Sequence, residues 1–202
     1  MNSFRTFFLL PLLVFLFSSC ASYDHRLNDP STRYLGLNGS LTSQERGTFA
    51  DRISYWDGDA ISGAPSIAID LSEQRLYYYK GNKLVAISAV STGAEGRETK
   101  TGHYRIMKKD LHHVSSECGD YVNNQGEVVI KNVVVPEVPM PSGAHFVGSP
   151  MPYYMMFYPG VGMHTGFLPG VPDSHGCIRL PDRMAKIFFE VTPMGTPVTV
   201  QR

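Results

Sequence analysis

The chain has 202 residues, which suits a single domain with a short appendage and leaves little room for two full domains. Its 18 Lys and Arg residues balance 18 Asp and Glu residues, so the formal net charge is zero and we expect no nucleic-acid partner. Hydrophobic residues make up 43% of the chain, which excludes wholesale disorder. The 19 Gly, 14 Pro, 11 Tyr and 11 Phe residues favour strands and turns over a helical bundle.

The N-terminus has the pattern of an export signal. An unbroken apolar run over residues 7–17 follows Arg5 and precedes Ser18 and Ser19, which predicts a signal peptide over residues 1–19. The run is too short for a permanent membrane-spanning helix, which needs about 20 residues. We therefore expect an exported protein with no spanning segment after residue 20.

Cys20 follows the small residues directly and resembles the cysteine of a bacterial lipobox, where the signal is cleaved and the thiol is lipidated. Phe17 departs from that motif, which usually has Leu at this position. The alternative is an ordinary cleavage near Ala21 or Ser22, with Cys20 incidental. The first interpretation predicts a lipid anchor that holds the protein to a membrane of the cell envelope, and the second predicts export alone.

Residues 20–64 are polar and predict a tether and N-terminal flank. Thr42 and Glu45 fit a helix capping box. Apolar side chains follow at helical spacing, at Phe49, Ile53 and Trp56. We therefore expect one short helix in the flank, packed on the domain that follows.

Residues 65–202 predict a mainly β domain of mixed sheets or a sandwich, with one or two short helices. Apolar and β-branched runs predict strands over 66–70, 75–80, 83–91, 102–109, 127–135, 153–157, 161–164 and 197–200. Gly81 and Asn82 fit a two-residue hairpin turn. Residues 181–190 predict a helix that begins at Pro181, with an apolar stripe of Met184, Ile187 and Phe188. Residues 110–126 and 136–152 are expected to be loops, the second a candidate lid.

The chemistry concentrates between residues 160 and 180, where His164, His175 and Cys177 occur together. A thiolate is the reactive form of cysteine, and a nearby imidazole can take its proton and later return it to a leaving amine. Gly176 beside the thiol would let a substrate approach and leave main-chain N–H groups for an oxyanion. The alternative is a buried small cysteine beside a satisfied core histidine.

The segment Ser174-His175-Gly176-Cys177-Ile178-Arg179 resembles the S/T-H-G-C signature of L,D-transpeptidase (YkuD-type) catalytic domains, and His164-Thr165-Gly166 resembles the upstream histidine motif of that family. Residues 67–76 are similar to its first hairpin, and residues 91–93 and 99–102 to its S-T-G and T-P-T-G turns. The resemblance spans residues 65–202. Two departures are Lys100 in place of proline and a loop of only nine residues between His164 and Ser174, which shortens one wall of the site.

The resemblance implies that Cys177 is the nucleophile and that His164 is the general base and then the acid. The carbonyl of Thr165 would hold the His164 tautomer, as a carboxylate does in other triads. His175 and Gly176 would act in catalysis through main-chain N–H groups that line the oxyanion region, together with that of Cys177.

The resemblance implies supporting roles for two further residues of the signature. Arg179 would stabilise the loop or meet a substrate carboxylate, and a structural ion pair is an equal alternative. Ser174 would support the turn or the bound substrate rather than act as a nucleophile.

The reaction implied is acyl transfer on peptidoglycan stem peptides, without a cofactor. Cys177 would attack the carbonyl of the third stem residue, commonly diaminopimelate, and release the terminal D-Ala as a thioester forms. An amine of another stem would then give a 3→3 cross-link. The alternatives are L,D-carboxypeptidase activity, attachment of a lipoprotein to the wall, and a non-catalytic wall-binding lipoprotein.

Other classes of enzyme fit less well. A metal hydrolase could draw ligands from His112, His113 and His145 in addition to the site residues, but no H-E-x-x-H motif exists and adjacent histidines point apart on a strand. A serine hydrolase lacks its G-x-S-x-G motif. We expect no metal.

The remaining cysteine and aromatic residues are interpreted as structural. Cys118 is expected to lie in a loop, and a disulfide with Cys177 is disfavoured because Cys177 has a catalytic explanation. A C-terminal aromatic cluster is expected in the core more than in a substrate groove, and comprises Tyr153, Tyr154, Phe157 and Tyr158. Tyr77, Tyr78 and Tyr79 alternate faces of a strand, so at least one is expected to be exposed.

Overall fold

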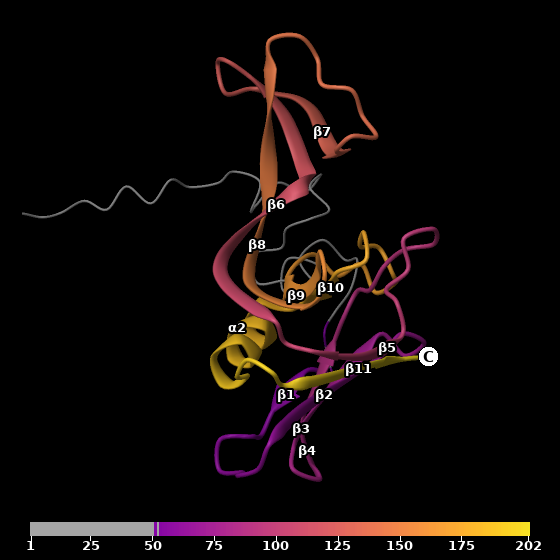
Figure 1. Cartoon of the computed structure of the whole chain (residues 1–202), viewed down its shortest axis with the longest axis vertical. Helices are drawn as coiled ribbons and strands as arrows, with labels where there is room; N and C mark the ends of the chain where they lie inside the picture. The colour runs from indigo at the N-terminus through magenta and orange to yellow at the C-terminus, as the bar shows by residue number, and fades with distance from the viewer. Residues whose placement is uncertain (1–50, 52) are drawn as a thin grey trace, which may run out of the picture.

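The computed structural model describes Asp51 and residues 53–202, which form two β-sheets and a short helix, so the mainly β prediction is confirmed (Figure 1). The predicted signal, the lipidation residue Cys20 and the first part of the flank lie outside the described residues. Within the described part, no helix is long and apolar enough to cross a bilayer.

The first sheet has the order β1-β4-β3-β2-β11-β5. Its strands are β1 (Tyr55–Trp56), β2 (Pro65–Asp70), β3 (Arg75–Lys80), β4 (Lys83–Ala89), β5 (Gly102–Arg105) and β11 (Pro197–Gln201). Lys80 pairs with Lys83 across Gly81 and Asn82, which confirms the two-residue turn. Gly81 has a φ of 58°, a left-handed conformation that glycine adopts without steric cost. The C-terminal strand β11 pairs in parallel with β2, the first strand of the β2–β3 hairpin.

The second sheet has the order β10-β9-β8-β6-β7. Its strands are β6 (Lys108–Asn123), β7 (Val128–Val134), β8 (Ala144–Tyr158), β9 (Val161–Thr165) and β10 (Ile178–Leu180). The long strands β6 and β8 bend around the body of the molecule and continue with β7 as an arm at the top of Figure 1. Register shifts interrupt the β6–β8 pairing between Val114 and Gly119, which allows the bend.

The prediction of loops over 110–126 and 136–152 is wrong for most of both segments. Residues 110–123 belong to β6 and residues 144–152 to β8. The pattern is hidden because both strands twist and shift register, so buried and exposed positions do not alternate regularly. The single strand expected over 102–109 is likewise divided, since β5 and β6 enter different sheets.

The helix predicted around Trp56 is also wrong for its described residues. Tyr55 and Trp56 form β1 and pair with Ile87 and Ala86 of β4. The Trp56 ring packs edge-on against Tyr78, with ring centroids 5.5 Å apart. Edge pairing and aromatic burial therefore outweigh the helical spacing. The first sheet thus begins before residue 65, within the segment assigned to the flank.

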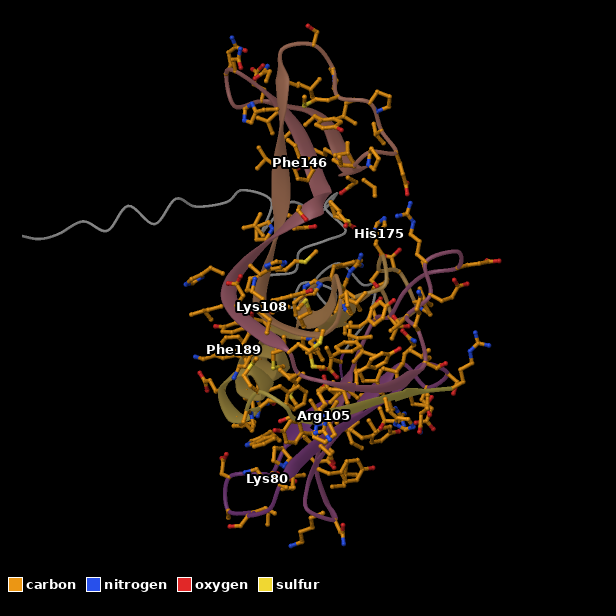
Figure 2. The ribbon with its side chains drawn as sticks, viewed as in Figure 1. Lys80, Arg105, Lys108, Phe146, His175 and Phe189 are labelled. Carbon is orange, nitrogen blue, oxygen red and sulfur yellow. The ribbon has the colours of Figure 1, made fainter. Side chains whose placement is uncertain are left out.

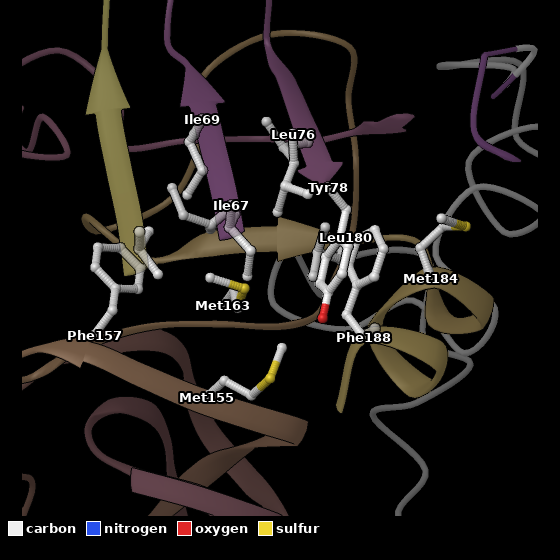
Figure 3. Packing of buried hydrophobic residues seen from close by; sticks show 14 of the residues in the cluster. Ile67, Ile69, Leu76, Tyr78, Met155, Phe157, Met163, Leu180, Met184 and Phe188 are labelled. Atoms are coloured by element: carbon white, nitrogen blue, oxygen red, sulfur yellow. The ribbon is translucent and has the colours of Figure 1, made fainter. Parts of the chain in front are cut away.

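The core lies between the two sheets and is closed by α2 (Asp182–Val191), close to the predicted helix 181–190 (Figure 3). Met184 and Phe188 of the predicted stripe are buried, and Ile187 packs against the cluster from a partly buried position. The Phe188 ring stacks on Tyr78 of β3 with centroids 5.2 Å apart, which ties the helix to the first sheet.

Candidate active site

The adjacent parallel strands β9 and β10 place the predicted catalytic residues on one surface. Arg179 pairs with His164, and Ile178 pairs with Met163. Because side chains alternate along a strand, Met163 and Ile178 point into the core while His164 and Arg179 point to the opposite face. Cys177 lies in the bend just before β10, and its side chain lines the same cavity as His164.

The side chain of His164 is buried and oriented by its own strand. Its Nδ1 lies 2.7 Å from the carbonyl oxygen of Thr165, which can only accept, so Nδ1 carries the proton and Nε2 is the basic nitrogen. Burial lowers the pKa of His164 to about 3, although the Thr165 hydrogen bond favours the charged form. His164 is therefore a neutral imidazole at physiological pH.

The thiol of Cys177 is also neutral in this state. Its residue is partly exposed, and its Sγ lies 4.0 Å from the carbonyl oxygen of Gly160. Burial of the sulfur raises the pKa of Cys177 to about 11, and the N–H of Gly162 opposes that shift. The thiol and the imidazole that line this cavity therefore both favour their neutral forms.

The thiol and the imidazole open into one cavity of about 180 Å³. The β6 strand forms one wall, and the loop before β10 forms the other. Figure 2 labels Lys108 on the first wall and His175 on the second. The polar and sulfur-containing residues that line it are Lys108, His113, Ser115, Ser116, Glu117, Cys118, Met151, Tyr154, Met156, His164, Ser174, His175, Cys177 and Arg179. His175 is exposed overall, but partial desolvation of its imidazole, together with the charges of Arg97 and Arg179, lowers its pKa.

Ser174 supports the loop that carries the nucleophile. Its Oγ donates to the carbonyl of Cys177 at 2.5 Å and accepts from the N–H of Gly176 at 3.0 Å. In this state the predicted oxyanion donor Gly176 is therefore engaged with Ser174, and its N–H would have to change partner to meet a substrate oxygen. Gly176 has a φ of 112°, a conformation that a side chain would strain.

The segment between β4 and β5 of the first sheet also holds this loop through hydrogen bonds. The hydroxyl of Thr99 accepts from the N–H of Gly93 at 3.0 Å and donates to the carbonyl of Gly176 at 2.8 Å. The carbonyl of Ser174 accepts from the N–H of Ala94 at 2.9 Å. A Cβ at Gly93 would stand 2.1 Å from the carbonyl oxygen of Arg97, so this close turn requires glycine. Thr99 was identified in the sequence as part of a turn motif, but its contact with the site was not.

Arg179 is 3% exposed and takes its partners from the loop between β9 and β10. Its guanidinium donates to the Asp173 carboxylate at 2.9 Å and to the Asp173 carbonyl at 2.8 Å. A longer contact of 3.4 Å reaches the carbonyl of Phe167. These bonds favour the structural ion pair over a substrate contact, although Arg179 also lines the cavity. Asp173 was missed in the sequence because it lies between motifs.

The family model of the L,D-transpeptidase catalytic domain (YkuD) matches residues 64–200. The chain belongs to the L,D-transpeptidase catalytic domain family. It is 29% identical over 137 residues to YbiS of Escherichia coli strain K12, named a probable L,D-transpeptidase, in a match that covers 65% of this chain and 43% of that protein. It is 27% identical over 139 residues to the probable L,D-transpeptidase ErfK/SrfK of Salmonella typhimurium strain LT2, covering 66% of this chain and 43% of that protein.

The chain thus matches less than half the length of these curated relatives. Among solved structures, an L,D-transpeptidase from Mycobacterium smegmatis superimposes with a TM-score of 0.53 at 16% identity, over 69% of this chain and 59% of that one. At this identity the superposition shows a shared fold.

Two residues of this L,D-transpeptidase domain face the site in ways that the sequence did not indicate. Tyr154 is 3% exposed, as a core residue would be, yet it also lines the cavity. His113 stacks on the Tyr154 ring with centroids 4.0 Å apart and lines the same cavity. Phe157 is fully in the core, and Tyr153 and Tyr158 pack against it from partly buried positions. Of the three consecutive tyrosines on β3, Tyr78 is buried and the other two are partly buried.

The histidines weighed as metal ligands lie apart in the domain. His112 and His113 are on β6, and His145 is exposed near the start of β8. Over residues 51 and 53–202, no group of three or more His, Cys, Asp and Glu side chains is placed to hold a metal ion. Cys118 is a buried residue of β6, not of a loop, and both it and Cys177 are free thiols.

Proposed function

We propose that this protein is a cysteine-dependent acyltransferase of peptidoglycan stem peptides, which releases the terminal D-Ala and forms 3→3 cross-links. The observation that carries the proposal is the cavity that Cys177 and His164 line together. The Cys177 thiol there is partly exposed, and the His164 imidazole has a defined tautomer. The signature around Cys177 and the family membership support the same chemistry.

In the first half-reaction, the Cys177 sulfur attacks the carbonyl of the third stem residue as its proton passes to Nε2 of His164. The imidazolium then protonates the departing amine of D-Ala, and a thioester remains. Burial of His164 favours its neutral form, so the imidazolium exists only between these two proton transfers. The main-chain N–H of Cys177, with those of His175 and Gly176 after the loop adjusts, would stabilise the oxyanion.

In the second half-reaction, an acceptor amine attacks the thioester, and the Cys177 thiolate leaves and recovers its proton through His164. Attack by water would make the protein an L,D-carboxypeptidase, and attack by a lysine of a lipoprotein would make it an attachment enzyme. Incubation of the purified chain with disaccharide-tetrapeptides, followed by mass spectrometry, separates these outcomes. Cross-linked dimers support the proposal, and tripeptides alone would replace it with hydrolysis.

We further propose that the protein acts in the cell envelope, with a signal over residues 1–19, a lipid on Cys20, a tether and N-terminal flank over 20–64 that adds β1 to the first sheet, and the catalytic domain over 65–202. Export would bring the domain to its peptidoglycan partner, and a lipid would add the membrane as a second one. The intact mass of the protein extracted from membranes tests this. The expected species begins at Cys20 and carries acyl chains, and an unmodified N-terminus at Ala21 or Ser22 would contradict the lipid.

A further inference from the structure

Formation of a cross-link requires the acceptor to lose two protons. A primary amine with a pKa of about 10.4 enters the site as an ammonium ion at neutral pH. It must lose one proton before it can attack and a second one as the new amide bond forms. Under the mechanism proposed above, His164 takes the second proton and returns it to Cys177. A second base in the cavity would take the first proton from the bound ammonium at neutral pH.

His113 of β6 occupies such a position. Its imidazole lines the cavity that contains Cys177 and His164, and its ring stacks on Tyr154, whose centroid lies 6.2 Å from that of His164. Its Nδ1 lies 3.3 Å from Oδ2 of Asp110. The stack and the ion pair together fix the ring, and with Nδ1 facing the carboxylate, Nε2 is the nitrogen left to accept a proton.

Asp110 is itself held in place. Its other oxygen accepts from the N–H of His112 at 3.2 Å, and Lys108 lies 3.7 Å from Oδ2. Burial raises the pKa of Asp110, but the hydrogen bonds from His112 and His113 outweigh it and hold the pKa below its usual value. The carboxylate is therefore charged at neutral pH and can accept a hydrogen bond from Nδ1 of His113.

The charges around His113 come from several elements. Lys108, Asp110, His112 and Glu117 belong to β6, and Tyr154 packs on the ring from β8. His164 of β9, Arg179 of β10, and His175 and Cys177 of the preceding loop line the same cavity. The His113 side chain is 25% exposed, so a proton taken from the acceptor can pass on to solvent.

We propose that His113, oriented by Asp110, is the general base that deprotonates the acceptor ammonium before it attacks the thioester. This inference rests on the proposed transpeptidase function. The acceptor R-NH3+ gives one proton to Nε2 of His113, and the imidazolium pairs with Asp110. The free amine attacks the thioester carbonyl, its second proton passes through His164 to the departing Cys177 thiolate, and His113 releases its proton to water.

The test compares the full chain with His113→Phe, which keeps an aromatic ring for the Tyr154 stack and removes the base. His112→Phe is the matched control, because His112 is exposed on the same strand and does not line the cavity. Each protein receives a tetrapeptide donor with either a stem-peptide amine or hydroxylamine, which is already unprotonated at neutral pH. Acyl transfer and hydrolysis products are quantified by mass spectrometry from pH 6 to 10.

We expect His113→Phe to lower the ratio of transfer to hydrolysis with the stem amine at least tenfold at pH 7, given that general bases contribute about 10²–10⁴. The ratio should recover as the pH approaches the pKa of the acceptor ammonium group. The rate of transfer to hydroxylamine should equal that of the parent chain. Equal losses with both acceptors would overturn the proposal and show that His113 only maintains the shape of the cavity. An unchanged ratio of transfer to hydrolysis with the stem amine would also overturn it. If the parent chain released no D-Ala, the proposed function would fail, and this inference with it.

Discussion

Thr99 donates a hydrogen bond of 2.8 Å to the carbonyl of Gly176, the residue before the thiol, from 77 positions away in the chain. The same hydroxyl accepts from Gly93, so one buried side chain links two turns of the first sheet to the catalytic loop. The loop before β10 is thereby fixed from the first sheet as well as by Ser174. The position of Cys177 depends on this contact between the two sheets.

Replacement Thr99→Val keeps the shape of the side chain and removes the hydroxyl. It leaves the N–H of Gly93 and the carbonyl of Gly176 without their partner, which should cost about 1–3 kcal/mol of unfolding free energy. We expect a larger proportional loss of D-Ala release than of stability, because the loop can shift while the sheet remains folded. Urea unfolding and product analysis measure the two effects, and Thr101→Val, an exposed neighbour in the same turn, is the control.

Asp173→Asn tests the role of Arg179. The substitution removes the charge that compensates a guanidinium that is 3% exposed. Loss of one partner of a buried pair costs about 3–5 kcal/mol, and we expect about 2 kcal/mol here because Asp173 is 23% exposed. A chemical denaturation series checks the value. Full stability combined with a raised KM for the donor would instead assign Arg179 to the substrate carboxylate.

Gly162 on β9 is expected to tolerate no side chain. A Cβ there would stand 2.5 Å from the Tyr154 ring and 2.8 Å from the carbonyl oxygen of Met155. Tyr154 cannot easily yield, since it is buried and stacked on His113. Gly162→Ala should therefore destabilise the domain by about 1–3 kcal/mol.

A double-mutant cycle identifies the cause of that loss. If the Tyr154 ring is the obstacle, Gly162→Ala should cost less in a Tyr154→Leu background than in the parent chain. Additive costs would show that the clash with the Met155 carbonyl, or another contact, accounts for the destabilisation.

The buried His164 should make the fold sensitive to acid. Its pKa is about 3 when folded and about 6.5 when unfolded, so between these values the unfolded chain binds a proton that the folded chain does not. Stability should consequently fall as the pH drops from 6.5 toward 3. Unfolding free energies at pH 7, 5 and 4 should decline less steeply in His164→Gln than in the parent chain, and parallel declines would contradict the low pKa.

The strands with regular alternation could be predicted from the sequence. The hairpins of the first sheet, β9, β11 and the helix α2 follow from apolar spacing and turn residues. The strands β6 and β8 could not, because residues 118–122 of β6 are buried in succession without alternation, and Pro150 and Pro152 lie within β8, where prolines argue against a strand. Their pairing is set by tertiary contacts, as is that of β1, where Trp56 packs on Tyr78 and Phe188.

The site shows a similar division. Cys177, His164 and Thr165 lie in motifs that resemble those of L,D-transpeptidase domains, and this resemblance, more than their spacing, indicates a thiol nucleophile and its base. Asp173 and His113 lie outside the motifs: Asp173 of the short loop pairs with Arg179, and His113 of β6 lines the cavity. Lys100 stands in place of proline in its turn without altering the Thr99 contact beside it. Contacts of this kind form only in the folded chain, so a local sequence pattern cannot predict them.

The most direct test of the central claim mixes the protein with a disaccharide-tetrapeptide, quenches the reaction rapidly and measures the intact mass of the protein. The account predicts an adduct equal to the donor minus D-Ala, located on Cys177 after digestion and lost on treatment with hydroxylamine. It also predicts that Cys177→Ala, shown to be folded, forms no adduct and releases no D-Ala. Release of D-Ala by Cys177→Ala at the parent rate, or an adduct on another residue, would contradict the claim that Cys177 is the nucleophile.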